Sequence, residues 1–151
     1  MTISLMTRML RRCALLAPVF GLVLLGLPGP ADAGIVARIS VAGQRMDVYV
    51  DGRPRYSWQV STARAGYHTP TGTFRPQALA VWHRSTIYSG SPMPHAIFFH
   101  GGYAIHGSYE TKYLGRPASH GCVRLHPAAA AELFSLVRQY GAANTVIQIG
   151  R

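Results

Sequence analysis

Cysteine is nearly absent from this 151-residue chain, which contains only Cys13 and Cys122. Cys13 belongs to an N-terminal segment typical of a removable export signal, so Cys122 is the one thiol that remains in an oxidising destination. A lone cysteine cannot form a disulfide within the chain. Cys122 is therefore a buried apolar side chain, an intermolecular bridge or a reactive nucleophile, and its sequence neighbours decide between these roles.

The chain also lacks a hydrophobic run long enough to span a bilayer. Residues 13–27 are apolar apart from a proline and two glycines, and about fifteen residues fall short of the roughly 20 that a spanning helix needs. Three arginines precede this run, and the small-x-small sequence Ala31-Asp32-Ala33 follows it. We predict that residues 1–33 are a secretory signal peptide, cleaved before Gly34, which directs the chain to the periplasm or cell-wall space and leaves no stable membrane span. The alternative is a retained membrane anchor.

Acidic residues are few. Residues 34–151 form one domain with 12 basic and 4 acidic side chains, a net charge of +8 with histidine neutral. For an exported protein, this charge favours anionic envelope polymers or membrane headgroups as partners over nucleic acid, although a solvated basic surface without a dedicated partner explains it equally well. Carboxylate ligands for a metal are correspondingly scarce, and neither HExxH nor CxxC occurs.

The rest of the chain predicts a mostly β, sandwich- or barrel-like domain. Alternating or β-branched runs predict strands, Asp51-Gly52 predicts a hairpin, and the turn formers of residues 65–74 predict a loop that leads into another strand. The strands are expected within residues 35–41, 46–50, 56–61, 79–88, 96–106 and 145–149.

One α-helix is expected near the C-terminus. Pro127 suits the first turn, residues 128–131 are four alanines, and Gly141 suits the C-terminal stop. Leu133, Phe134 and Val137 provide its apolar face. The cysteine thus lies on the turn and strand just before this helix.

The neighbours of Cys122 favour a nucleophile. Gly121 allows backbone geometry closed to other residues and a close approach of substrate, His120 and Arg124 are basic, and Ser119 supplies a hydroxyl. A structural cysteine would more often occupy an aliphatic run. The reactive thiol is therefore the favoured role.

A cysteine nucleophile needs a histidine within hydrogen-bond reach after folding. His106 is the best candidate among the seven histidines, because it ends an apolar strand and is followed by a glycine. A zinc site held by His106, His120 and Cys122 with an open water position is the rival interpretation, but the expected ligand spacing is missing. We therefore predict no metal or other cofactor.

Three sequence blocks together resemble the L,D-transpeptidase catalytic domain, the YkuD-like family. They are IHGS at residues 105–108, SHGCVRL at 119–125 and TPTGTF at 69–74. The resemblance covers essentially all of residues 34–151. The first two blocks at this separation are highly specific, whereas the third alone would be weak.

The resemblance implies acyl transfer on peptidoglycan stem peptides, and hence a part in peptidoglycan biosynthesis, cell-wall organisation and cell shape. Cys122 would attack the carbonyl that joins the third stem residue to a terminal D-alanine, and the thioester would then pass to an amine to give a 3-3 crosslink. His106 would activate the thiol, with its ring oriented by the carbonyl of Gly107. The remaining expected roles are oxyanion binding by backbone N–H groups around His120, Gly121 and Cys122, and substrate binding or site support by Ser119 and Arg124.

Two alternative functions stay open, and the chain departs from the family's sequence pattern at one position. A hydrolase on the same scaffold and a non-catalytic peptidoglycan-binding domain are both open, although a binding module has no use for a free exported thiol. The family commonly has an acidic or amide residue where this chain has Ala129, near the start of the helix. Its loss is expected to weaken the helix start rather than the chemistry.

Overall fold

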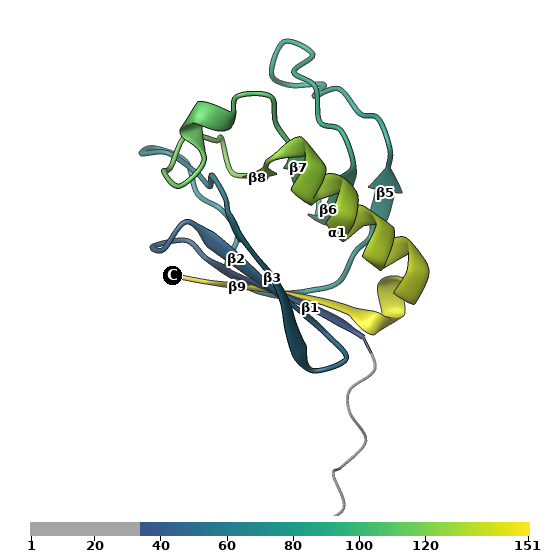
Figure 1. Cartoon of the computed structure of the whole chain (residues 1–151). Coiled ribbons are helices and arrows are strands. Elements are labelled where there is room, and N and C mark those ends of the chain that lie inside the picture. The colour runs from purple at the N-terminus through teal and green to yellow at the C-terminus, as the bar shows by residue number, and fades with distance from the viewer. Residues whose placement is uncertain (1–33) are drawn as a thin grey trace, which may run out of the picture.

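The structure is a computed structural model that describes residues 34–151 (Figure 1), so the predicted signal peptide lies outside the described residues. The described chain forms two β-sheets and one α-helix, which confirms the mostly β fold with a single marked helix. The elements are β1 (Ile35–Ser40), β2 (Arg45–Val50), β3 (Arg53–Gln59), β4 (Gly72–Phe74), β5 (Ala78–Ala80), β6 (Ala96–His100), β7 (Tyr103–Gly107), β8 (Val123–Leu125), α1 (Pro127–Tyr140) and β9 (Thr145–Gly150), with 3-10 turns at Thr111–Tyr113 and Ala142–Asn144.

The first sheet has the strand order β3-β2-β1-β9-β4. Its hairpin between β2 and β3 turns at Asp51 and Gly52, whose φ angles of 50° and 74° are the two positive values that a tight type I′ turn needs. This predicted hairpin is confirmed. Strand β9 pairs in parallel with β1 and antiparallel with β4, so it is an interior strand of this sheet.

The second sheet, β5-β6-β7-β8, differs from the sequence expectation in one region. The strand predicted within residues 79–88 is wrong beyond β5, because residues 81–95 form a loop that crosses back to β6. Hydrogen bonds from His95 N to Val81 O and from Met93 N to His83 O, each 2.8 Å, close the base of this loop. Residues that favour strands form none here because they have no core to cover: Val81 is 56% and Ile87 77% exposed.

The helix forms where the sequence predicts it, with Pro127 in its first turn and Gly141 at its end. Its N-cap is His126, whose Nδ1 accepts a hydrogen bond from the N–H of Ala128 at 3.2 Å. The cap at the helix start is thus supplied by His126, and a weaker helix start at Ala129 stays a prediction. Ala129 is buried against the core, where a polar side chain would need a partner, and the cap is supplied by a different residue.

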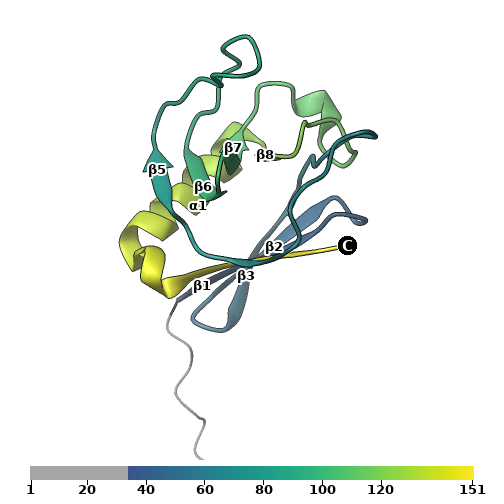
Figure 2. The ribbon, with the colours of Figure 1, turned by 180° about the vertical axis from the view of Figure 1, so that it is seen from behind.

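One continuous core joins the two sheets and the helix. On β6 to β8, alternate side chains such as Phe99, Ile105 and Val123 point into this core, where they meet the buried face of α1 and the first sheet. The helix lies on one face of the second sheet, in front of it in Figure 1 and behind it in Figure 2. The opposite face of that sheet is left for the 81–95 loop to cover.

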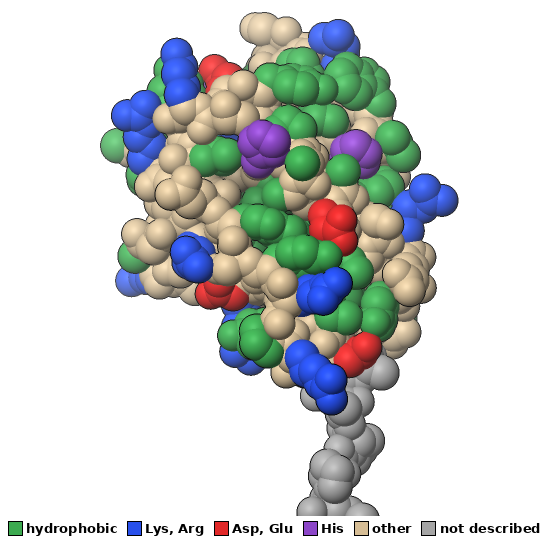
Figure 3. All heavy atoms as spheres, in the orientation of Figure 1, with side chains coloured by type: hydrophobic (Ala, Val, Ile, Leu, Met, Phe, Trp, Pro, Cys, Tyr) green, Lys and Arg blue, Asp and Glu red, His purple; other side chains and the backbone are tan. Residues whose placement is uncertain are grey.

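The surface over the helix is mixed in character. Figure 3 shows hydrophobic side chains gathered toward the upper right of this view, over the 81–95 loop, with basic and acidic side chains scattered over the rest of this face. The loop's large exposed residues are Val81, Trp82, Ile87 and Tyr88. None of the helices in residues 34–151 is long and apolar enough to cross a membrane.

Candidate active site

Strand pairing brings the histidine and the cysteine together. β7 and β8 pair in parallel, with Ile105 opposite Val123 and His106 opposite Arg124. Since side chains alternate along a strand, Ile105 and Val123 enter the core while His106 and Arg124 share the other face. Cys122 directly precedes β8 and lies on that same face. The predicted pair thus lines a single cavity.

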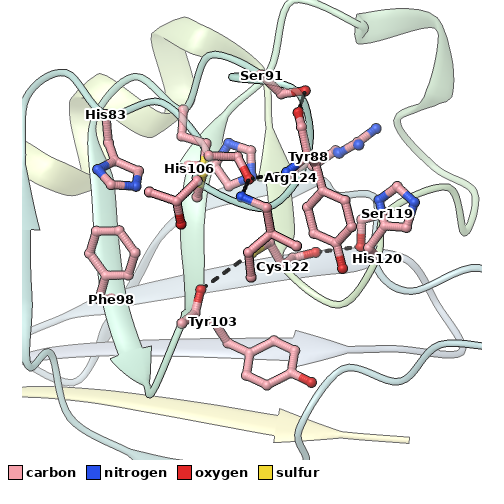
Figure 4. A pocket seen from close by; sticks show the side chains of 15 residues that line it. His83, Tyr88, Ser91, Phe98, Tyr103, His106, Ser119, His120, Cys122 and Arg124 are labelled. Carbon is pink, nitrogen blue, oxygen red and sulfur yellow. Dashed lines mark hydrogen bonds between the residues drawn. The ribbon is translucent and has the colours of Figure 1, made fainter.

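The cavity has a volume of about 500 Å³ and lies between the outer face of the second sheet and the 81–95 loop. In Figure 4, His106, Cys122 and Arg124 lie near its middle, with side chains of both the sheet and the loop around them. His83 and Phe98 line one end, and Tyr88 and His120 line the other.

His106 is buried and held in one orientation. Its Nδ1 lies 2.7 Å from the carbonyl oxygen of Gly107. A carbonyl oxygen can only accept, so Nδ1 carries the proton and Nε2 is the basic nitrogen. Burial lowers the pKa of His106 to about 4; the Gly107 hydrogen bond opposes this effect, whereas the charges of Arg124 and His83 add to it. At neutral pH the ring is therefore a neutral acceptor.

Cys122 is a neutral thiol in the same environment. Its side chain is partly buried, and Sγ lies 4.0 Å from the carbonyl oxygen of Gly102. Burial raises the pKa of Cys122, and the N–H of Ala104 and the charge of Arg124 only partly oppose that change. The resting pair is therefore thiol and imidazole rather than thiolate and imidazolium.

The backbone around the cysteine depends on a glycine. Gly121 has φ +134°, and a Cβ there would lie 2.4 Å from Cε1 of Tyr103 and 2.8 Å from the carbonyl oxygen of His68. Its N–H donates to Oγ of Ser119 at 3.0 Å. Of the three N–H groups predicted to face an oxyanion, that of Gly121 is therefore already bound, which leaves those of His120 and Cys122 as candidates.

The hydroxyl of Ser119 also serves the backbone. It donates to the carbonyl oxygen of Cys122 at 2.7 Å, and the residue is 1% exposed. Ser119 borders the cavity, so substrate binding stays a prediction for it, while its observed contacts stabilise the turn that carries the thiol.

His120 forms a wall of the cavity. Its ring stacks on Tyr88 of the loop, with centroids 4.1 Å apart, and Tyr67 meets it edge-on at 4.6 Å. Within residues 34–151, no three His, Cys, Asp or Glu side chains are grouped so that they could hold a metal ion. The arrangement thus gives no support to the zinc interpretation with His106, His120 and Cys122.

Arg124 has a partner that the sequence did not reveal. Its Nη1 lies 2.8 Å from Oε2 of Glu110, and the two side chains are 17% and 57% exposed. Sequence reasoning also missed Tyr88 and gave no role to Thr69 of the TPTGTF block. Glu110 could have been noted as one of only four acidic residues after residue 33. Nothing in the sequence around Tyr88 indicates a site residue, because Tyr88 reaches the cavity through the fold of a long loop.

Comparison with known proteins agrees with this geometry. Residues 34–149 match the family described as the L,D-transpeptidase catalytic domain, YkuD. No curated protein sequence matches the chain.

Several solved structures are similar. An L,D-transpeptidase from Mycobacterium smegmatis has a TM-score of 0.70 at 22% identity, over 79% of this chain and 59% of that one. One from Xylanimonas cellulosilytica has a TM-score of 0.66 at 29% identity, over 78% and 61%. L,D-transpeptidase 3 from Mycobacterium tuberculosis in complex with a faropenem-derived adduct has a TM-score of 0.65 at 17% identity, over 78% and 60%.

The chain thus spans about three fifths of the length of these solved proteins. The family match covers nearly all of the described residues and includes both motif blocks of the cavity. This chain therefore belongs to the L,D-transpeptidase catalytic-domain family.

Proposed function

We propose that this protein is a cysteine-dependent L,D-transpeptidase acting on peptidoglycan stem peptides, with Cys122 as nucleophile and His106 as general base. The observation that carries the proposal is the single cavity that holds the thiol and the basic nitrogen of an oriented, neutral imidazole. Such a pair is what thioester formation requires: a thiol that attacks the carbonyl carbon and a base that takes the proton of that thiol.

The first half-reaction forms a thioester. Sγ attacks the carbonyl carbon between the third stem residue and the terminal D-alanine, the thiol proton passes to Nε2 of His106, and the carbonyl π electrons move to oxygen. When this tetrahedral species collapses, the C–N bond breaks and D-alanine leaves with the proton from His106. The amide bond is thus exchanged for a more reactive thioester.

The second half-reaction reverses these roles. An amine of a second stem attacks the thioester carbon and its proton passes to His106, the C–S bond breaks, and the thiol is regenerated with a 3-3 crosslink as product. Because Nδ1 is bound to Gly107 throughout, Nε2 alone exchanges protons in both steps.

The low pKa of His106 sets the timing of proton transfer. A base whose pKa is lowered to about 4 and a thiol whose pKa is raised do not exchange a proton at rest. The proton therefore moves as the C–S bond forms, when negative charge reaches the carbonyl oxygen. We assign the stabilisation of that charge to the backbone N–H groups of His120 and Cys122, where each donor contributes about 2.7 to 4 kcal/mol in comparable sites.

Arg124 is proposed to support the site. Its ion pair with Glu110 leaves guanidinium donors on the cavity side, where they are available to a substrate carboxylate. Because Glu110 is largely exposed, the ion pair itself contributes little to stability.

We further propose that the chain works in the periplasm or cell-wall space and is held near its polymer by charge. Among residues 34–151, the ion pairs are Arg45 with Asp47 and Arg124 with Glu110, so most of the basic side chains face solvent without an acidic partner. Binding to purified sacculi should therefore weaken as salt is raised. Binding that is indifferent to salt would contradict this charge-based attachment.

The decisive experiment uses residues 34–151 and a disaccharide-tetrapeptide that ends in D-alanine, with products followed by mass spectrometry. We expect a dimer formed with loss of one D-alanine, abolished in Cys122→Ala and in His106→Ala but retained in His100→Ala, whose histidine is exposed and outside the cavity. Tripeptide alone would replace the proposal with a hydrolase. Wall binding without any Cys122-dependent product would replace it with a binding domain.

A β-lactam gives a second, simpler probe. A structurally similar protein carries a faropenem-derived adduct, and we propose that Cys122 opens the faropenem ring in the same way that it attacks a stem peptide. Sγ bonds to the lactam carbonyl carbon, the ring C–N bond breaks and the nitrogen takes the proton. The initial adduct is therefore heavier than the protein by one whole faropenem and is absent in Cys122→Ala.

A further inference from the structure

We propose that Thr69 is a positioning residue for the oxyanion donor at Cys122, an inference that rests on the proposed acyl transfer. Thr69 opens the TPTGTF block, to which the chemistry above assigns no role. Its hydroxyl donates to the carbonyl oxygen of Gly121 at 2.9 Å and accepts from the N–H of Ala63 at 3.1 Å. A residue 52 positions away in sequence is thus bonded directly to the peptide that precedes the nucleophile.

The peptide between Gly121 and Cys122 is the unit that matters. A trans peptide is planar, and its C=O and N–H point in opposite directions; the described residues contain no cis peptide bond. Fixing the carbonyl of Gly121 therefore fixes the direction of the Cys122 N–H. Thr69 acts on the donor through this rigid plane without touching the substrate.

The peptide needs an external hold because its local conformation is an unusual one. Gly121 has φ +134°, a value that only glycine adopts readily, and glycine itself provides little resistance to rotation. Of the four backbone polar groups of Gly121 and Cys122, three are bound by side-chain hydroxyls: two by Ser119 and the Gly121 carbonyl by Thr69. The fourth is the Cys122 N–H, the proposed donor to the oxyanion.

The backbone that binds Thr69 is itself fixed by hydrogen bonds. Ala63, which donates to it, lies beside Ser119 in a parallel bridge, with Arg64 N bonded to Ser119 O and Ser119 N bonded to Thr62 O. Thr69 is 6% exposed, so water has little room to replace its hydroxyl. The hydroxyl thus closes a ring of backbone contacts around the turn that carries the thiol.

Two reactions of Cys122 separate this role from a merely structural one. Opening of faropenem develops an oxyanion and needs the donor, whereas alkylation by iodoacetamide is a displacement at saturated carbon and develops none. The readout is the ratio of the acylation rate to the alkylation rate, because a general loss of structure lowers both.

We expect Thr69→Val to lower the acylation rate about 10- to 100-fold, less than the roughly 10²- to 10³-fold loss when an oxyanion donor is removed outright. The alkylation rate should stay within about twofold, since valine keeps the shape but not the hydroxyl. Thr69→Ser should restore acylation to within about threefold of wild type. Thr71→Val, at an exposed threonine in the same block, is the matched control and should leave both rates unchanged.

The inference would be overturned if Thr69→Val were acylated by faropenem as fast as wild type. It would also be overturned if Thr69→Val lowered the acylation and alkylation rates in parallel and Thr69→Ser restored both to the same extent. If the valine variant does not fold, Thr69→Ala is compared with Thr69→Ser by the same ratio of acylation to alkylation. Alanine removes the hydroxyl without placing a γ-methyl group against the N–H of Ala63 and the carbonyl oxygen of Gly121. A wild-type protein that reacts with iodoacetamide but with neither faropenem nor the tetrapeptide would instead overturn the proposed function, and this inference with it.

Discussion

Replacing Gly121 by alanine should destabilise the protein by about 3 kcal/mol. Holding a non-glycine residue at φ +134° costs about 1–3 kcal/mol. The new Cβ would also lie 2.4 Å from the ring of Tyr103 and 2.8 Å from the carbonyl oxygen of His68. The ring can turn away but the backbone carbonyl cannot, so we add about 1–3 kcal/mol for overpacking. Alanine also lowers the conformational entropy of the unfolded chain, which offsets about 0.4–1 kcal/mol of this loss of stability.

Gly66→Ala is the matched control, because Gly66 also has a positive φ, +84°, but a Cβ there would have no neighbour within 4 Å. It should therefore cost only the backbone strain, about 1 kcal/mol after the unfolded-state gain. Urea unfolding of both variants measures the difference directly, and the midpoint of thermal unfolding should fall by about 12 °C for Gly121→Ala. Equal destabilisation of the two variants would refute the assignment of a steric role to Tyr103 and His68.

Three further predictions concern the neutral resting pair and the interior. Because burial lowers the pKa of His106 to about 4 and raises that of Cys122, the iodoacetamide alkylation rate should rise continuously above about pH 7; a plateau between about pH 5 and 8 would indicate a thiolate–imidazolium pair. For the same reason, the acid limb of kcat/KM should fall near the low pKa of His106 rather than near 6.5, since the base is lost only on protonation. Gln44→Met should cost about 2 kcal/mol in urea unfolding, because it leaves the buried N–H of Thr62 without the acceptor that now lies 2.9 Å away, and an unchanged midpoint would contradict this.

The short-range features of the fold could be predicted from the sequence because they depend on neighbouring residues. Asp51-Gly52 determines its hairpin through two positive φ angles, and the helix between Pro127 and Gly141 forms from alanine propensity and matching ends. The strand predicted within residues 79–88 was wrong beyond β5 because strand formation depends on residues far away in the sequence. A strand needs a partner strand and a core to cover, and both come from distant parts of the chain. The strand-favouring residues beyond β5 meet neither, so they stay in a loop.

The sequence by itself determined which residues could carry the chemistry: a cysteine that follows a glycine, Cys122, and a histidine that precedes one, His106. It could not determine their pKa values, since these depend on burial by the 81–95 loop and the sheet. Nor could it place Thr69 on the carbonyl of Gly121, because sequence distance carries no information about a contact made through packing.

Only the tertiary structure decided that His106 and Cys122 share one cavity, through the parallel pairing of β7 with β8. Parallel strands need a long connection, so their register cannot be read from a local turn and is fixed instead by which face is buried. Ile105 and Val123 enter the core, and the alternation of side chains then leaves His106 and Arg124 facing the cavity.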